Sequence, residues 1–161
     1  MIKLETAIQA LADNNVDFVI VGGVAIKIHS SAYVTLDLDF CYARTKQNLI
    51  NIVSALSKFN PRPRDFPKDL PYFFDERSLQ NATNFTFETT IGDLDLLGEV
   101  AGVGTYMVVE KSSVIFELYD RDVKVLSVDA LIKAKRAAGR DKDLLVLPEL
   151  EALREVLNEE E

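Results

Sequence analysis

The chain has 161 residues and an excess of acid, with 18 Lys and Arg against 26 Asp and Glu and a formal net charge of −8. This length fits one domain with a continuous core. Proteins that track DNA or RNA need a cationic surface, so the charge argues against general nucleic-acid affinity. One cysteine, Cys41, and one histidine, His29, exclude both an intramolecular disulfide and a zinc site of four Cys and His ligands. Any bound metal must therefore use oxygen ligands.

The start of the chain and its hydropathy pattern do not suggest a membrane protein. Polar residues occur early, at Lys3, Glu5 and Gln9. No apolar run approaches the roughly 20 residues that span a bilayer. We therefore expect a cytoplasmic protein with no membrane partner.

Helices and strands alternate in the N-terminal part of the chain. Apolar residues at helical spacing, from Leu4 to Leu11, predict that the chain opens with an amphipathic helix closed by Asn14-Asn15. The β-branched run Phe18–Val21 predicts a strand buried on both faces, which stops at two glycines. The pattern then predicts a short helix over Val24–His29, a half-buried strand over Thr35–Tyr42 and a helix over Thr45–Lys58.

A proline-rich segment, residues 60–74, holds four of the five prolines. Its aromatic residues are Phe66, Tyr72, Phe73 and Phe74. A solvated linker would not expose so much aromatic surface, so we expect a loop packed on the domain. The basic residues of the segment are Arg62, Arg64 and Lys68. They could meet a nucleotide or an acceptor, but we interpret them as solvated loop charges.

Strands and then helices follow in the second half. Alternating patterns predict strands over Asn84–Thr89 and Gly92–Gly98, joined as a hairpin, and a further pair over Val114–Leu118 and Val123–Leu126. Residues 127–157 predict two C-terminal helices, the first capped by Ser127 and ended by Gly139, the second with Pro148 in its first turn. The whole pattern predicts a single α/β (α+β) domain over residues 1–161, with a mixed β-sheet flanked by helices.

The sequence Asp37-Leu38-Asp39 is the most informative feature of the chain. Residues two apart on a strand point to the same face, so these carboxylates stand side by side and repel unless a cation lies between them. Mg²⁺ prefers one or two carboxylates together with phosphate oxygens and water. The pair therefore favours a metal that carries a nucleoside triphosphate. An exposed acidic strand face is the alternative interpretation.

Asp93-Leu94-Asp95 repeats this arrangement on a second predicted strand. If the two strands are neighbours, a third carboxylate faces the first two, and three acids around two metal ions form the clamp used for in-line displacement at phosphorus. We expect Asp95 to be the ligand and Asp93 to be a strand-start or turn residue.

Gly22 and Gly23 follow a buried strand and precede a helix. At such a corner, backbone N–H groups and a helix N-terminus can meet phosphates. The segment lacks the third glycine of a dinucleotide fingerprint and the Gly-Lys-Ser/Thr ending of a P-loop, so a tight turn without a ligand is the competing interpretation.

Together these residues resemble the nucleotidyltransferase fold superfamily, which includes DNA polymerase beta. Within it they resemble small bacterial minimal nucleotidyltransferases and abortive-infection toxins. The signature is a buried strand, Gly-Gly or Gly-Ser, a short helix and then Asp-x-Asp, here Val19–Ala25 followed by Thr35–Phe40. Residues 126–144 also look like the end of these domains. Many relatives carry Arg where this chain has Tyr33.

The resemblance implies roles for individual residues. Asp37 and Asp39 would bind the Mg²⁺ or Mn²⁺ that carries the NTP, and Asp95 would bind the second metal and help activate the acceptor hydroxyl. Gly22 and Gly23 would cradle the phosphates. The implied reaction transfers a nucleoside monophosphate to a hydroxyl of a protein, a small molecule or a tRNA end and releases pyrophosphate.

Lys135 is a further candidate nucleotide-binding residue. It falls on the helix stripe that Val128, Leu131 and Ile132 mark as buried. A lysine in that position commonly extends its ammonium to the rim of the core. The alternative is that Lys135 reaches the phosphates or neutralises the acidic site.

Three other functions fit parts of the pattern. The chain could be a catalytically inactive nucleotide-binding or regulatory partner, as in a toxin–antitoxin pair, or an interaction module with an acidic face. An aspartate-nucleophile phosphatase also uses Asp-x-Asp, but it needs a strongly apolar strand before the pair, and residues 30–35 do not form one. Because so short a chain has little room to bind an acceptor, we expect a homodimer or a partner protein to complete that site.

Overall fold

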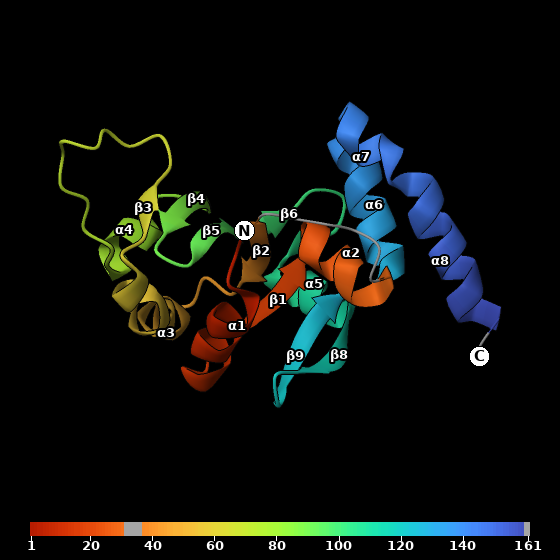
Figure 1. Ribbon diagram of the computed structural model, residues 1–161, viewed down its shortest axis with the longest axis horizontal. Coiled ribbons are helices and arrows are strands. Elements are labelled where there is room, and N and C mark those ends of the chain that lie inside the picture. The colour runs from red at the N-terminus through yellow and green to blue at the C-terminus, as the bar shows by residue number, and fades with distance from the viewer. Residues whose placement is uncertain (31–36, 160–161) are drawn as a thin grey trace.

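The computed structural model describes residues 1–30 and 37–159, so the sequence interpretations of Tyr33, Thr35 and Leu36 lie outside the described residues (Figure 1). A seven-stranded sheet has the order β3-β4-β5-β2-β1-β9-β8. Its strands are β1 (Phe18–Val21), β2 (Asp37–Tyr42), β3 (Arg62–Pro63), β4 (Asn84–Thr89), β5 (Gly92–Leu97), β8 (Ser113–Leu118) and β9 (Arg121–Leu126). A small sheet pairs β6 (Glu99–Val100) with β7 (Gly104–Thr105).

The helices flank this sheet, as the sequence predicts. They are α1 (Leu4–Asp13), α2 (Gly22–Ser30), α3 (Lys46–Leu56), α4 (Glu76–Gln80), α5 (Tyr106–Lys111), α6 (Val128–Ala138), α7 (Asp141–Leu145) and α8 (Leu147–Glu159), and a 3₁₀ turn over Ser57–Phe59 follows α3. In Figure 1, α6, α7 and α8 gather at the end of the molecule opposite the loop that follows β3. The chain is therefore a mixed α/β protein.

The central strands are mixed in direction. β1 pairs antiparallel with β2 and parallel with β9, and β2 pairs parallel with β5. All four residues of β1 are buried, which explains its unbroken apolar run. Along β2 and β5 the side chains alternate, so that Leu38, Phe40, Leu94 and Leu96 lie in the core and the aspartates occupy the opposite face.

Local capping determines where several helices begin and end. The hydroxyls of Thr45 and Ser127 accept hydrogen bonds from backbone N–H groups in the first turns of α3 and α6. α6 ends where Gly139 adopts a left-handed conformation with φ of 64°. These two helices follow the predicted boundaries to within two residues.

Several elements differ from the sequence prediction. α2 begins at Gly22 rather than Val24, and the proline-rich segment contributes the short edge strand β3, which pairs with β4. Helices α4, α5 and α7 were not predicted, because five or six residues are too few to show a helical period.

The proline-rich segment packs its aromatic residues against the sheet. The rings of Tyr72 and Phe74 lie 6.1 and 5.4 Å from the ring of Phe87 on β4, and Phe66 makes an edge contact with Tyr72. Phe73 instead points outward and is 72% exposed. The segment therefore packs on β4 through Tyr72 and Phe74.

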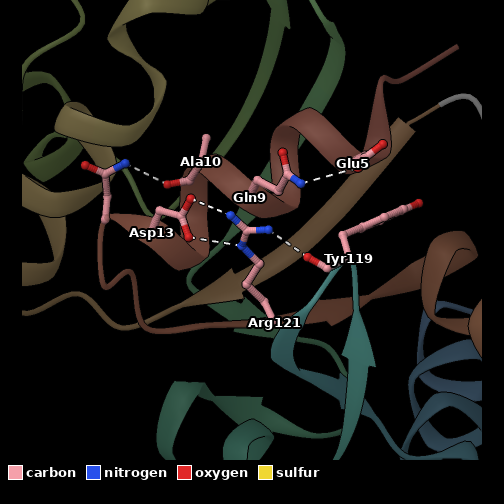
Figure 2. A network of polar contacts seen from close by, with 7 residues as sticks. Glu5, Gln9, Ala10, Asp13, Tyr119 and Arg121 are labelled. Carbon is pink, nitrogen blue, oxygen red and sulfur yellow. Dashed lines mark hydrogen bonds and ion pairs between the residues drawn. The ribbon is translucent and has the colours of Figure 1, made fainter.

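A polar network attaches the turn between β8 and β9 to helix α1 (Figure 2). Arg121 binds both carboxylate oxygens of Asp13, with Nε and Nη2 at 3.1 and 2.8 Å, and donates to the carbonyl of Tyr119. The same helix carries an exposed hydrogen bond from Gln9 to Glu5. Within the part of the chain that the structure describes, no helix has the length and apolar character needed to cross a membrane.

Candidate active site

Four aspartates meet on one face of the sheet because β2 and β5 are parallel neighbours. Asp37 lies opposite Asp93, and Asp39 lies opposite Asp95. Since side chains at paired positions share a face, the two Asp-Leu-Asp segments place all their carboxylates together. The sequence predicted both segments, and the structure supplies the pairing that joins them.

Gly22 lies directly against this cluster. The last residue of β1, Val21, pairs with Asp39, and the chain then turns into α2 at Gly22 with φ of +66°. A Cβ at this position would collide with the Oδ2 atom of Asp39. Glycine is therefore required both by the left-handed backbone and by the nearby carboxylate. Gly23 is the second residue of α2, so the N-terminal turn of this helix faces the aspartates.

The carboxyl of Asp39 is in an unusual electrostatic environment. Burial, the charge of Asp95, a hydrogen bond with Asp95 and the charge of Asp37 together raise the pKa of Asp39 to about 7, against the opposing charge of Lys135. Burial and the charge of Asp95 also raise the pKa of Asp37. The Oδ1 atom of Asp39 is buried and has no hydrogen-bond partner among residues 1–30 and 37–159. An unpaired buried carboxylate oxygen is costly, and a cation would satisfy it.

The guanidinium of Arg64 lies among the remaining carboxylates. Its Nη1 atom is 3.2 Å from Asp93 Oδ2 and 3.7 Å from Asp37 Oδ2, and its Nη2 atom forms an ion pair with Asp95 Oδ1. The sequence interpretation of Arg64 as a solvated loop charge is therefore wrong. No local pattern could have revealed this contact, because it depends on the pairing of β3 with β4.

A pocket of about 260 Å³ opens beside Asp39, between the sheet and α6. Gly22 and Asp39 line it from the sheet, and Lys135 and Arg140 line it from α6 and the turn that follows. Lys135 and Arg140 both hold the fully buried carboxylate of Asp143, with Nζ at 3.3 Å and Nε at 2.6 Å. Lys135 thus lines the pocket beside Asp39, and Arg140 and Asp143 are residues to which the sequence analysis assigned no role.

The donor set fits a divalent cation, although the carboxylates do not converge on one point. Among residues 1–30 and 37–159, no three His, Cys, Asp or Glu side chains are already arranged as a metal cluster. Oxygens of Asp37 and Asp95 face Arg64 instead. The Oδ1 atom of Asp39, which has no partner in the described part of the chain, and the space kept by Gly22 are two features that suit a metal with hard oxygen ligands.

The structure also places His29 and Cys41, two other residues considered in the sequence analysis. The His29 ring is 2.9 Å from the carbonyl of Leu126 and makes an edge contact with Phe116, and burial lowers its pKa. Cys41 is buried in the sheet, and burial raises the pKa of its thiol to about 12. Neither side chain lines the pocket beside Asp39.

Comparison with known proteins identifies the fold. No protein-family model and no curated protein sequence matches the chain. Solved structures do match, and three of them are described here. The first is a lincosamide antibiotic adenylyltransferase, LnuA, in its lincomycin-bound form, with a TM-score of 0.60 and 14% sequence identity over 93% of this chain and 95% of that chain. The second is the protein TM1012 of Thermotoga maritima, assigned provisionally as a nucleotidyltransferase, with a TM-score of 0.57 and 16% identity over 99% of this chain and 96% of that chain. The third is an antigenic nucleotidyltransferase-like protein of Paracoccidioides brasiliensis, with a TM-score of 0.56 and 14% identity over 95% of this chain and 77% of that chain.

These identities are low, so the likeness concerns the path of the chain and not the chemistry of the site. It extends over nearly the full length of the chain in each case. The chain therefore shares the fold of these nucleotidyltransferase structures.

Proposed function

We propose that this protein is a metal-dependent nucleotidyltransferase, which transfers a nucleoside monophosphate from an NTP to a hydroxyl group and releases pyrophosphate. The observation that carries the proposal is the pairing of Asp39 with Asp95 across β2 and β5, directly beside Gly22. The fold it shares with an antibiotic adenylyltransferase agrees with this reaction class.

Three carboxylates would hold two metal ions. Asp37 and Asp39 would bind the cation that carries the triphosphate, Mg²⁺ or Mn²⁺, and Asp95 would share a second one with them. Divalent metal supplies charge stabilisation to the attacking and leaving oxygens of an in-line displacement at phosphorus. The buried and unpaired Oδ1 of Asp39 supports its place in this set.

The phosphates would lie between α6 and the turn at Gly22 and Gly23, which we call the glycine corner. Backbone N–H groups of Gly22 and Gly23 at the start of α2 would donate to phosphate oxygens, a use for which helix N-termini are suited. Lys135 lines the same pocket and would contribute positive charge opposite the helix end. Asp143 fixes the Lys135 ammonium and is a positioning residue in this scheme.

In the transfer step one bond forms, one bond breaks and one proton is transferred. The hydroxyl oxygen of the acceptor attacks the α-phosphorus, the bond between that phosphorus and the bridging oxygen breaks, and pyrophosphate leaves with the electron pair. Asp95 would accept the hydroxyl proton. The acceptor is a protein side chain, a small molecule or a tRNA end, and a second copy of the chain or a partner protein would help to bind it.

The proposal is tested by incubating the purified protein with α-labelled NTPs, Mg²⁺ or Mn²⁺ and cell extract. We expect label to enter one class of acceptor, and we expect no transfer by an Asp39→Asn, Asp95→Asn double variant. If both proteins bind NTP and neither transfers label nor releases pyrophosphate, the inactive nucleotide-binding partner becomes the better account.

A further inference from the structure

Arg64 places a positive charge inside the cluster of carboxylates. It lies one residue beyond β3, and its backbone N–H donates to the carbonyl of Thr86 at 3.0 Å. Thr86 on β4 pairs with Asp95 on β5. Because Arg64 lies next to Thr86, its side chain lies on the face of the sheet that carries the aspartates. The side chain is 26% exposed and therefore sits at the mouth of the cluster.

The guanidinium uses oxygens that a divalent cation would also need. It contacts Asp37 and Asp95, which are two of the three proposed metal ligands, and it contacts Asp93, which is not one of them. A Mg²⁺ ion must approach carboxylate oxygens to about 2.1 Å, and like charges at such short range repel strongly. Arg64 takes Oδ2 of Asp37 and Oδ1 of Asp95, and its charge opposes a metal ion at the remaining oxygens of the same carboxylates.

We propose that Arg64 is an internal cation that closes the carboxylate cluster, and that divalent metal binds only when the guanidinium withdraws from Asp37 and Asp95. This inference rests on the metal-dependent transfer proposed above. Asp93 keeps the withdrawn guanidinium close to the site, which gives a role to the fourth aspartate.

Withdrawal needs a side-chain rotation and no change of fold. The Arg64 backbone stays on β4 through its bond to Thr86, while partly exposed ion pairs of this kind are each worth about 1 kcal/mol or less. A triphosphate that arrives with the metal offers the guanidinium a new partner, because Arg binds phosphate oxygens bidentately. Opening of the cluster would thus be coupled to arrival of the nucleotide.

Arg62 provides a matched control from the same segment. Its Nη2 atom donates to the carbonyls of Pro67 and Leu70 at 2.7 and 2.9 Å, so it braces the loop and touches none of the four aspartates in the contacts described. Replacing either arginine removes one positive charge from the protein. Only the loss of Arg64 removes a cation from the cluster.

The test is a Mn²⁺ titration of the full chain at pH 8 without nucleotide, with free Mn²⁺ followed by electron paramagnetic resonance. We expect Arg64→Gln to bind Mn²⁺ about tenfold more tightly than wild type, or about 1.4 kcal/mol. Arg62→Gln should stay within about twofold of wild type. Arg64→Lys, which keeps the charge and loses the planar fork, should fall between the wild type and the glutamine variant.

The outcomes separate this inference from the proposed function. If wild type transfers nucleotide and Arg64→Gln binds Mn²⁺ no more tightly than wild type, Arg64 does not close the site and the transfer proposal stands. If no variant binds Mn²⁺ and none transfers label, both are wrong. Should Arg64→Gln fail to fold without metal, the thermal midpoints of wild type and Arg64→Lys with and without Mn²⁺ decide, and we expect the larger rise in the lysine variant.

Discussion

Asp39 on β2 lies opposite Asp95 on β5, and burial, the charge of Asp95 and a hydrogen bond between the two carboxyls raise the pKa of Asp39 to about 7. Two carboxylates in such contact cannot both be ionised without a cation between them. The pair therefore responds to both protons and metal ions, and its properties can be measured without knowing the acceptor.

The raised pKa of Asp39 predicts that metal-free protein loses stability as the pH rises. Because the folded protein binds this proton more tightly than the unfolded chain, the free energy of unfolding should fall between pH 3.8 and about 7, and then level off. Asp39→Asn has no proton to lose, so at pH 8 in EDTA it should be more stable than wild type, by at most about 4 kcal/mol. Urea unfolding of both proteins at pH 5 and pH 8 measures the difference.

Addition of divalent metal should reverse this order at pH 8. Mn²⁺ should raise the free energy of unfolding of wild type and leave Asp39→Asn nearly unchanged, since binding to the folded state alone stabilises it. If wild type is as stable as the variant at pH 8 in EDTA, ionisation of Asp39 does not destabilise the folded protein and the prediction is wrong.

Gly22→Ala tests the contact between the glycine corner and Asp39. The new methyl group would displace the Asp39 carboxylate and would also occupy a left-handed backbone, so both metal binding and activity should be lost. Gly139→Ala is the matched control, because Gly139 has nearly the same φ but its Cβ would meet nothing closer than 3.6 Å. Each variant should lose about 1 kcal/mol of stability from the backbone alone, and Gly139→Ala should keep its metal affinity.

An alanine at position 22 that binds Mn²⁺ as well as wild type would contradict the placement of the metal beside this corner. Equal loss of metal affinity in Gly139→Ala would point to a general effect of destabilisation instead.

Lys135→Met tests whether the α6 side of the pocket binds the triphosphate. Loss of one ammonium from the phosphate region should weaken NTP affinity about tenfold, as measured by calorimetry with a non-hydrolysable analogue. Lys133, exposed on the same helix, serves as the control, and Lys133→Met should bind the analogue like wild type. Unchanged affinity in Lys135→Met would return Lys135 to a purely structural role as the partner of Asp143.

Local sequence patterns predicted much of this arrangement. The apolar run of β1, the glycine corner and the alternation around Asp37, Asp39 and Asp95 follow from short-range spacing, and these carry the resemblance to the superfamily. Whether β2 and β5 would be neighbours could only be stated as a condition, because strand pairing across more than fifty residues leaves no local trace.

The parts that sequence analysis missed depend on tertiary contacts. Arg64 was interpreted as solvated because its partners lie on strands 31 and 27 residues away, at Asp95 and Asp37. Asp143 was not recognised because its neighbours Lys142 and Leu144 are exposed, and only the turn at Arg140 buries the carboxylate between two cations. For both residues, the tertiary contacts with a neighbouring sheet or helix determine the role of the charged side chain.

The most direct test of the account is the position of metal in crystals grown with Mn²⁺ and a non-hydrolysable NTP analogue, located by anomalous scattering. We predict a peak within about 2.2 Å of oxygens from both Asp39 and Asp95, with the triphosphate against Gly22 and the Arg64 side chain withdrawn from Asp95. Mn²⁺ and nucleotide bound elsewhere, with Arg64 still seated on Asp95, would contradict it.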